Sequence, residues 1–184
     1  MPIETNRTDS SSLTDTSVGS AFVHYVRETQ GDALAKITHC VDQLAGEDLQ
    51  WRQFGSHNSI QNMILHLCRN LHQWIGYTVG GAPDIRDRPA KFSDRRPQSK
   101  SELMTMLRNA VAEADETLAA FPPDRLPEHR QVQGVDSTLL GATLDSVHHF
   151  VRHTHQIVFV TRLRLGDVCR FQWIPQGIDH TEPD

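Results

Sequence analysis

The sequence predicts an all-α fold, a single four-helix bundle. Four stretches carry apolar residues at spacings of three and four, which place those residues on one face of a helix. Two long connections separate some of these stretches, and no alternation long enough for a strand is evident. The 184 residues suit one domain of ordinary size.

The first two helices are expected in the N-terminal half of the chain. The first covers residues 21–45, with an interruption near Gly31 and a stop at Gly46. The second begins at Asn58, which can cap it together with Gln61 three residues on, and it runs to about residue 79.

The other two helices follow a long loop at residues 82–100. The third begins at residue 99 or 100 and runs to residue 120, where two prolines end it. The fourth covers residues 137–165 and stops at Gly166.

The ends of the chain are expected to differ from each other. Residues 1–20 are rich in Ser, Thr and Asp, and we expect a flexible tail. Residues 21–184 form the single domain, including a C-terminal tail whose Phe171, Trp173 and Ile174 are expected to pack back on the helices.

Composition excludes several classes of partner. The net charge is −5 and no basic run is present, so nucleic acid is not expected as a partner. No apolar run approaches the roughly 18 residues of a membrane span, and no signal-peptide core is found. The three cysteines are far apart and odd in number, which favours a reducing cytoplasm over a disulfide framework.

The candidate chemistry lies in histidines. His149 and His153 are four residues apart, so a helix presents both on one face. His66 lies on a polar stripe that borders the apolar face of the second helix. Zinc and similar ions bind neutral imidazole, and catalytic sites commonly use three protein ligands and an open position. The alternatives are a hydrogen-bonded core pair for His149 and His153 and a buried, satisfied histidine for His66.

Other residues could support such a site. Asn62, Asn70 and Gln156 are candidates to hydrogen-bond the ligands, and a pocket is expected to open near residues 80–100. Within that loop, Arg86 and Arg88 could bind an anionic substrate or could form surface ion pairs. Cys68, a lone helix cysteine, is expected in the core.

These residues belong to an ordered series of motifs that resembles the DinB-like superfamily, in particular its branch of uncharacterised bacterial proteins. The resemblance covers roughly residues 20–173. The motifs are Asn58-Ser59-Ile60, Leu65-His66-Leu67, Asn70-Leu71, Gln73-Trp74-Ile75, Gly80-Gly81, Asp84 with Arg86-Asp87-Arg88, Gln133-Gly134, His149-Phe150, His153-Thr154 and Gln156-Ile157.

The resemblance implies an up-down-down-up four-helix bundle, a homodimer, and a divalent metal, often zinc or nickel, on a three-histidine site. The implied ligands are His66, His149 and His153. One departure is His148, at a position that is often acidic in such proteins. The superfamily includes thiol S-transferases that use low-molecular-weight thiols such as bacillithiol, a mycothiol-dependent isomerase and metal hydrolases, and many members have no established activity.

Two functions therefore compete. In the first, the metal activates water or a low-molecular-weight thiol, so that the protein is a hydrolase or a thiol S-transferase acting on a small molecule of unknown identity. No acidic residue flanks the three histidines as a general base, so no catalytic residue is assigned. In the second, a non-catalytic, metal-stabilised bundle acts through dimerisation or partner binding. Apolar residues almost all round the fourth helix also favour a homodimer.

Overall fold

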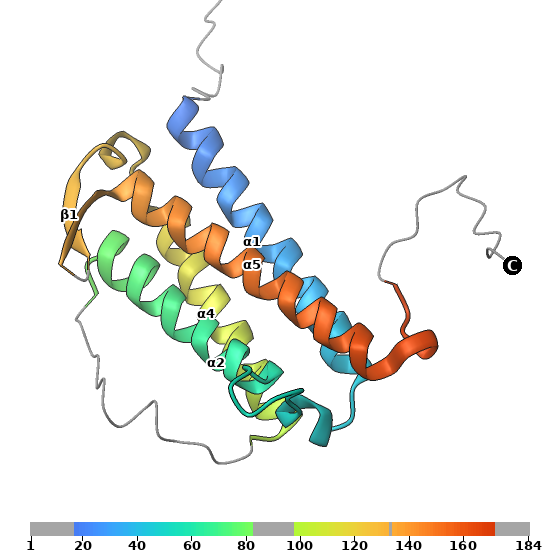
Figure 1. The fold of residues 1–184 in the computed structure, drawn as a ribbon. Helices are drawn as coiled ribbons and strands as arrows, with labels where there is room; N and C mark the ends of the chain where they lie inside the picture. Colours follow the sequence, from blue (N-terminus) through green and yellow to red (C-terminus); the bar gives the residue numbers. More distant parts are fainter. Residues whose placement is uncertain (1–16, 83–97, 133, 172–184) are drawn as a thin grey trace, which may run out of the picture.

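The computed structural model describes residues 17–82, 98–132 and 134–171. The described part is mostly helical, as predicted, with one small sheet that was not predicted (Figure 1). Its elements are α1 (Val18–Gln43), η1 (Glu47–Gln50), α2 (Ile60–Leu71), η2 (His72–Val79), α4 (Lys100–Ala120), η3 (Pro123–Arg125), β1 (His129–Val132), β2 (Val135–Thr138), α5 (Leu139–Leu165) and η4 (Gly166–Val168). The segments outside the description include Arg86, Arg88, Trp173, Ile174 and most of the expected N-terminal tail.

The helices lie side by side, and their directions follow from contacts between their ends. Arg27 of α1 forms a two-pronged ion pair with Asp115 late in α4, so α1 and α4 are antiparallel. α1 and α5 pack together and run the same way, while α2 and α4 run the other way (Figure 1). α2 continues directly into the π-helix η2, so one long helical segment leads up to the connection that precedes α4.

The helix ends differ in detail from the predicted ends. α1 begins three residues earlier than expected because the Ser17 side chain caps it, and it passes through Gly31 without a break. Ser59, not Asn58, caps α2, and the Gln61 side chain accepts a hydrogen bond from the Gln98 backbone instead of completing the predicted capping pair. α4 begins as expected, with a capping box between Ser99 and Glu102.

The hairpin of β1 and β2 corrects the prediction that the chain has no strand. The two strands pair antiparallel, with His129 opposite Thr138 and Val132 opposite Val135. Gly134 lies in the connection between them with a positive φ of 83°, which glycine adopts without steric cost. Because the second strand takes up residues 135–138, α5 begins at Leu139, two residues later than predicted.

The core is apolar and receives side chains from every long helix. Fully buried residues include Ile37 of α1, Ile64 of α2, Leu107 of α4 and Phe150 of α5. This core does not depend on the histidines, so the fold is expected to form from apolar burial alone. No helix in the described part of the chain combines the length and the apolar character that crossing a membrane requires.

The described end of the chain returns to α1. The carbonyl of Arg170 accepts hydrogen bonds from His39 and Gln43, and its N–H donates to the Gln43 side chain. Phe171 lies beneath the Arg162 guanidinium, at 4.9 Å, but its side chain is 57% exposed. The backbone at Arg170 therefore contacts α1, whereas Phe171, which was expected to pack on the helices, stays largely open to solvent.

Candidate metal centre

Three histidines from two antiparallel helices meet between α2 and α5. His66 comes from α2, and His149 and His153 come from successive turns of α5. Each offers a ring nitrogen, and these three nitrogens all lie within 4.8 Å of one another. In the described part of the chain this is the one group of three or more His, Cys, Asp or Glu side chains that meets this geometry. We call these three residues the histidine cluster.

A neighbouring hydrogen bond fixes the register of the two helices. Ser146 of α5 donates to the side-chain oxygen of Asn70 of α2 at 3.0 Å. Asn70 lies one turn after His66, and Ser146 lies about one turn before His149. Because α2 and α5 run in opposite directions, this contact places His66 level with the histidine pair of α5.

The rings are close enough to share one ion after a small adjustment. The Nε2 atoms of His66 and His149 are 2.6 Å apart, so the N–H of one ring donates a hydrogen bond to the unprotonated nitrogen of the other. His66 and His149 are 4.7 Å from each other between ring centroids, and each is within 5.1 Å of His153. Zinc bonds of roughly 2.0–2.1 Å at tetrahedral angles separate two ligand nitrogens by roughly 3.3 Å, so an opening of several tenths of an ångström admits the ion.

Electrostatics keep the cluster in its metal-binding form. Burial lowers the pKa of His66, His149 and His153, and for each it is the largest cause. The pKa of His149 falls to about 4, with further lowering from the charges that His153 and His66 would carry. At neutral pH the rings are therefore neutral, and each has a nitrogen lone pair available to a cation.

The residues expected to support the ligands divide into two groups. Gln156 lies three residues after His153 on α5, and its side chain acts to raise the pKa of that ring, against the larger effect of burial. Asn62 and Asn70 instead use their side-chain oxygens for Arg52, Ser59 and Ser146. The buried Nδ1 of His153 has no hydrogen-bond partner among the described residues.

The other sequence-predicted features are placed less simply. Arg86 and Arg88 lie outside the described residues. A cavity of about 370 Å³ reaches Gly80 and Ala82, where a pocket was expected, but no histidine of the cluster lines it. Burial raises the pKa of the Cys68 thiol to about 11, so this thiol stays protonated at neutral pH, consistent with the predicted core role.

Sequence reasoning missed Arg69 and the segment at residues 51–58. The positive charge of Arg69 contributes to the lowered pKa of His66. Residues 47–57 were predicted to be a connection that covers one end of the core and Asn58 to be a helix cap, yet several residues of 51–58 line a cavity between α2 and α5. Arg69 lies three residues after His66 on the same helix, so their proximity could have been read from the spacing. The cavity has no local sequence signal, because it depends on how residues 51–58 fold against α5.

Comparisons with known proteins give a fold relative and a family. No curated protein matches the chain. A conserved protein from Enterococcus faecalis with a known crystal structure is similar in fold, with a TM-score of 0.63 at 15% identity, over 78% of this chain and 97% of that one. Residues 17–178 match the family described as "Protein of unknown function (DUF1572)". Because this match spans most of the sequence, the chain belongs to the DUF1572 family.

Proposed function

We propose that the protein is a divalent-metal-dependent enzyme whose histidine cluster holds zinc or nickel. The observation that carries this proposal is the convergence of three ring nitrogens, from His66, His149 and His153, within 4.8 Å of one another. The lowered pKa values of the three rings add to it, since only neutral imidazole binds a metal. The motifs shared with the DinB-like superfamily and the directions of the helices support the same reading, with an up-down-down-up four-helix bundle as the fold.

The chemistry follows from the ligand set. Three neutral ligands leave the ion's full double charge to acidify a water or a thiol placed beside it. The remaining task of the chain is to position a substrate beside the ion. The substrate is a small molecule, and the reaction is hydrolysis or the transfer of a low-molecular-weight thiol. No carboxylate belongs to the cluster among the described residues, so the group that accepts the proton is unassigned.

Elemental analysis tests the metal site directly. Protein purified without added metal and without an affinity tag should contain close to one zinc or nickel ion per chain. His66→Ala should lose the ion, because two ligands from one helix bind far more weakly than three, while its circular-dichroism spectrum should keep the helical signal. His155→Ala, which removes an exposed histidine of the same helix α5, is the matched control and should retain the metal.

The metal contents of these proteins distinguish a catalytic three-histidine site from the alternatives. Equal metal content in the wild type and in His66→Ala would remove His66 from the site. No metal in the wild type, even after reconstitution, would end the metalloprotein proposal. A fourth protein ligand in the metal's X-ray absorption spectrum, with no turnover of thiol or ester substrates, would favour the non-catalytic, metal-stabilised protein.

A homodimer and a cytoplasmic location are part of the proposal. Tyr25 of α1 and Leu140 of α5 are 67% and 40% exposed, which leaves apolar surface available to a second copy. Light scattering at micromolar concentration should give twice the chain mass of 20.8 kDa. A monomer under these conditions would contradict the dimer without affecting the metal site.

A further inference from the structure

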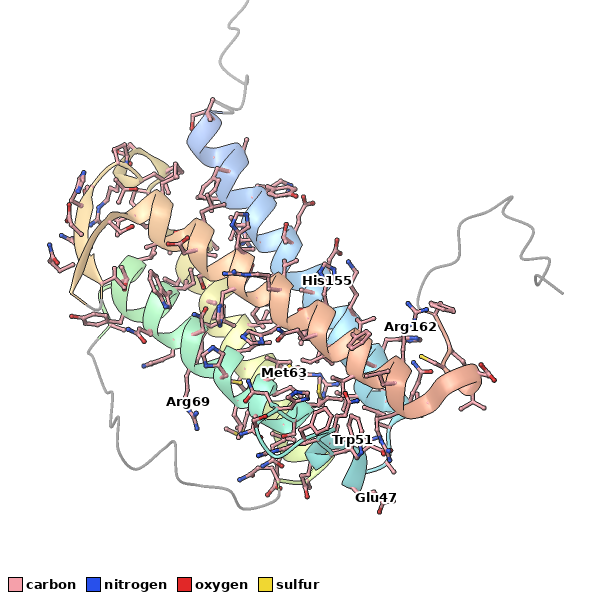
Figure 2. All side chains as sticks on the ribbon, in the orientation of Figure 1. Glu47, Trp51, Met63, Arg69, His155 and Arg162 are labelled. Carbon is pink, nitrogen blue, oxygen red and sulfur yellow. The ribbon has the colours of Figure 1, made fainter. Side chains whose placement is uncertain are left out.

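A cavity of about 380 Å³ lies between the start of α2 and the C-terminal half of α5, the two helices that carry the histidine cluster. Its walls come from the connection at residues 51–58, the first turns of α2 and the C-terminal half of α5. Figure 2 shows Trp51 and Met63, two of its lining residues, on the side of the molecule where α2 begins and α5 ends. The volume is at the lower end of the range of small-molecule sites, roughly 300–1,000 Å³.

This cavity adjoins the cluster on both helices. Met63 lies three residues before His66 on α2, and Gln156 lies three residues after His153 on α5. Three residues of helix correspond to roughly 4.5 Å, so the cavity begins about one turn from the ligands. Gln156 lines the cavity and its side chain also affects the pKa of His153, so it is the lining residue that relates the cavity to the cluster.

The charge of the cavity wall is positive. Arg52 is its one residue with a permanent charge, and no Asp or Glu lines it. The acidic residue nearest in sequence, Asp48, accepts two hydrogen bonds from Arg164 at 2.6 and 2.9 Å and is therefore already paired. In the described part of the chain no carboxylate pairs with Arg52, so its charge is available to a bound anion.

The Arg52 side chain is held in place by neutral groups. Its Nη2 donates to the side-chain oxygen of Asn62 at 2.7 Å, and that oxygen also accepts from the hydroxyl of Ser59 at 2.5 Å. This contact uses one of the five N–H donors of the guanidinium, and the others can bind a carboxylate in a forked geometry. Asn62 therefore orients Arg52 without neutralising it.

The rest of the wall is apolar and in part aromatic. The guanidinium of Arg164 lies over the ring of Trp51, 5.0 Å from its centroid. Phe159 contributes a largely exposed ring, and Met63 forms part of the floor next to α2. An exposed aromatic ring on a cavity wall gains stability when a ligand's apolar surface covers it.

We infer that this cavity binds the reacting molecule, a small organic anion with an apolar body. Its carboxylate or similar anionic group pairs with Arg52, and its body lies along Trp51 and Phe159. The end near Gln156 then faces the histidine cluster. The inference rests on the proposed function for the reacting centre, but anion binding at Arg52 can be measured with or without a metal.

The test is an NMR titration of the whole chain with phenylacetate, and with its neutral analogue phenylacetamide. The Trp51 indole N–H signal, assigned with Trp51→Phe, reports on the cavity. Phenylacetate should shift this signal in the metal-free wild type, and Arg52→Gln should weaken its binding by about tenfold or more, because a charge-assisted hydrogen bond is lost. Phenylacetamide should bind the wild type and Arg52→Gln equally.

Two further variants keep the test independent of any effect of Arg52 on folding. Ser56→Glu places a negative charge on an exposed lining residue, and it should weaken phenylacetate without affecting phenylacetamide. Arg108→Gln removes an exposed arginine of α4 that does not line the cavity, so it should bind phenylacetate like the wild type.

The outcomes distinguish this inference from the metal proposal. Arg52-dependent binding in a protein that takes up neither zinc nor nickel would support the cavity and end the proposed metal function. No shift of Trp51, or equal phenylacetate binding by the wild type, Arg52→Gln and Ser56→Glu, would overturn the cavity even if zinc binds. Binding seen only in zinc-loaded protein and unchanged by Arg52→Gln would place the anion on the metal and also overturn it.

Discussion

At the scale of single residues, burial decides which protonation state the histidine cluster adopts. His66, His149 and His153 come from two helices, and each loses water when those helices pack. A charged ring in this position would face two other rings instead of solvent, so the neutral form is favoured. The same effect that prepares the site for a cation makes the metal-free fold sensitive to acid.

The first prediction concerns that sensitivity. An unfolded histidine takes up its proton near pH 6.5, whereas folded His149 does so only near 4. Between these values the unfolded chain binds more protons, so the free energy of unfolding of metal-free protein is highest above about 6.5 and falls as the pH drops toward about 4. Denaturant unfolding of His149→Gln should show a flatter pH profile, and His155→Gln should match the wild type. Identical profiles for all three proteins would contradict the argument.

A second prediction concerns Gln30, which sequence reasoning did not single out. Its side chain is 1% exposed, and neither amide atom has a hydrogen-bond partner among the described residues. Gln30→Met keeps the length of the side chain and removes the cost of burying an unpaired amide, about 1–3 kcal/mol. We expect its melting temperature to rise by a few degrees.

The control for Gln30 is Gln43, a glutamine of the same helix whose side-chain amide is hydrogen-bonded. Gln43 bonds the carbonyls of His39 and Arg170 through its amide nitrogen, so Gln43→Met should lower the melting temperature. If Gln30→Met is also destabilising, or if it reduces metal content, the amide of Gln30 has a partner that the argument omits.

The candidate site was predictable where it rests on helix periodicity. The spacing of His149 and His153 places both on one face of a helix. His66 lies at the edge of the apolar face of its helix, and that position predicts that its ring faces a packed helix. The roles of Asn62 and Asn70 were not predictable in this way. Their partners, Arg52 and Ser146, are 10 and 76 residues away in sequence, and only the packing of the helices brings Asn70 to Ser146.

At the scale of elements, the long helices were predictable and the short strands were not. Each helix repeats its apolar residues over several turns, so an error at one end leaves the pattern intact. β1 has four residues, of which only the last is buried, so it has no alternation to detect. The π-helix η2 was predicted only as a continuation of helix, because its apolar residues do not by themselves reveal the wider turns.

A third prediction compares two glycines in helical segments. A Cβ on Gly80, at the end of η2, would lie 2.7 Å from the carbonyl oxygen of Gly76 and 2.7 Å from a methyl carbon of Thr117 on α4. Because the first contact is with backbone, Gly80→Ala should lower the free energy of unfolding by about 1–3 kcal/mol. Gly31 in α1 has open space around its Cβ position, so Gly31→Ala should raise it by about 0.5–1 kcal/mol. Urea unfolding of both variants measures the difference, and equal effects would refute the close approach at Gly80.

At the scale of the whole molecule, the histidine cluster joins helices that are distant in sequence. His66 and His149 are 83 residues apart, so an ion bound by both links the two halves of the chain. The apolar core already holds the same helices together, with Ile64 and Phe150 fully buried. An ion bound at the cluster would therefore add stability to a fold whose core does not require it, because the unfolded chain has no comparable site.

The last prediction follows from this difference between the folded and unfolded states. A ligand that binds only the folded state stabilises it by about 2.7 kcal/mol when its free concentration is a hundred times its dissociation constant. For a chain of this size that corresponds to a rise of roughly 5–10 °C in melting temperature, measured by calorimetry on metal-free protein with zinc or nickel added. Magnesium should have no such effect, because it prefers oxygen ligands to imidazole.

The control for this rise is His153→Ala, which keeps all the other histidines of the chain. The chain has 11 histidines, so a pair of them on the surface could also bind zinc. Two histidines close in sequence can bind zinc in the unfolded chain as well, so zinc bound to such a pair would stabilise the fold little. The rise should therefore disappear in His153→Ala. An equal rise in this variant and in the wild type would place the stabilising ion elsewhere, because removing one of three converging ligands cannot leave the affinity of the cluster unchanged.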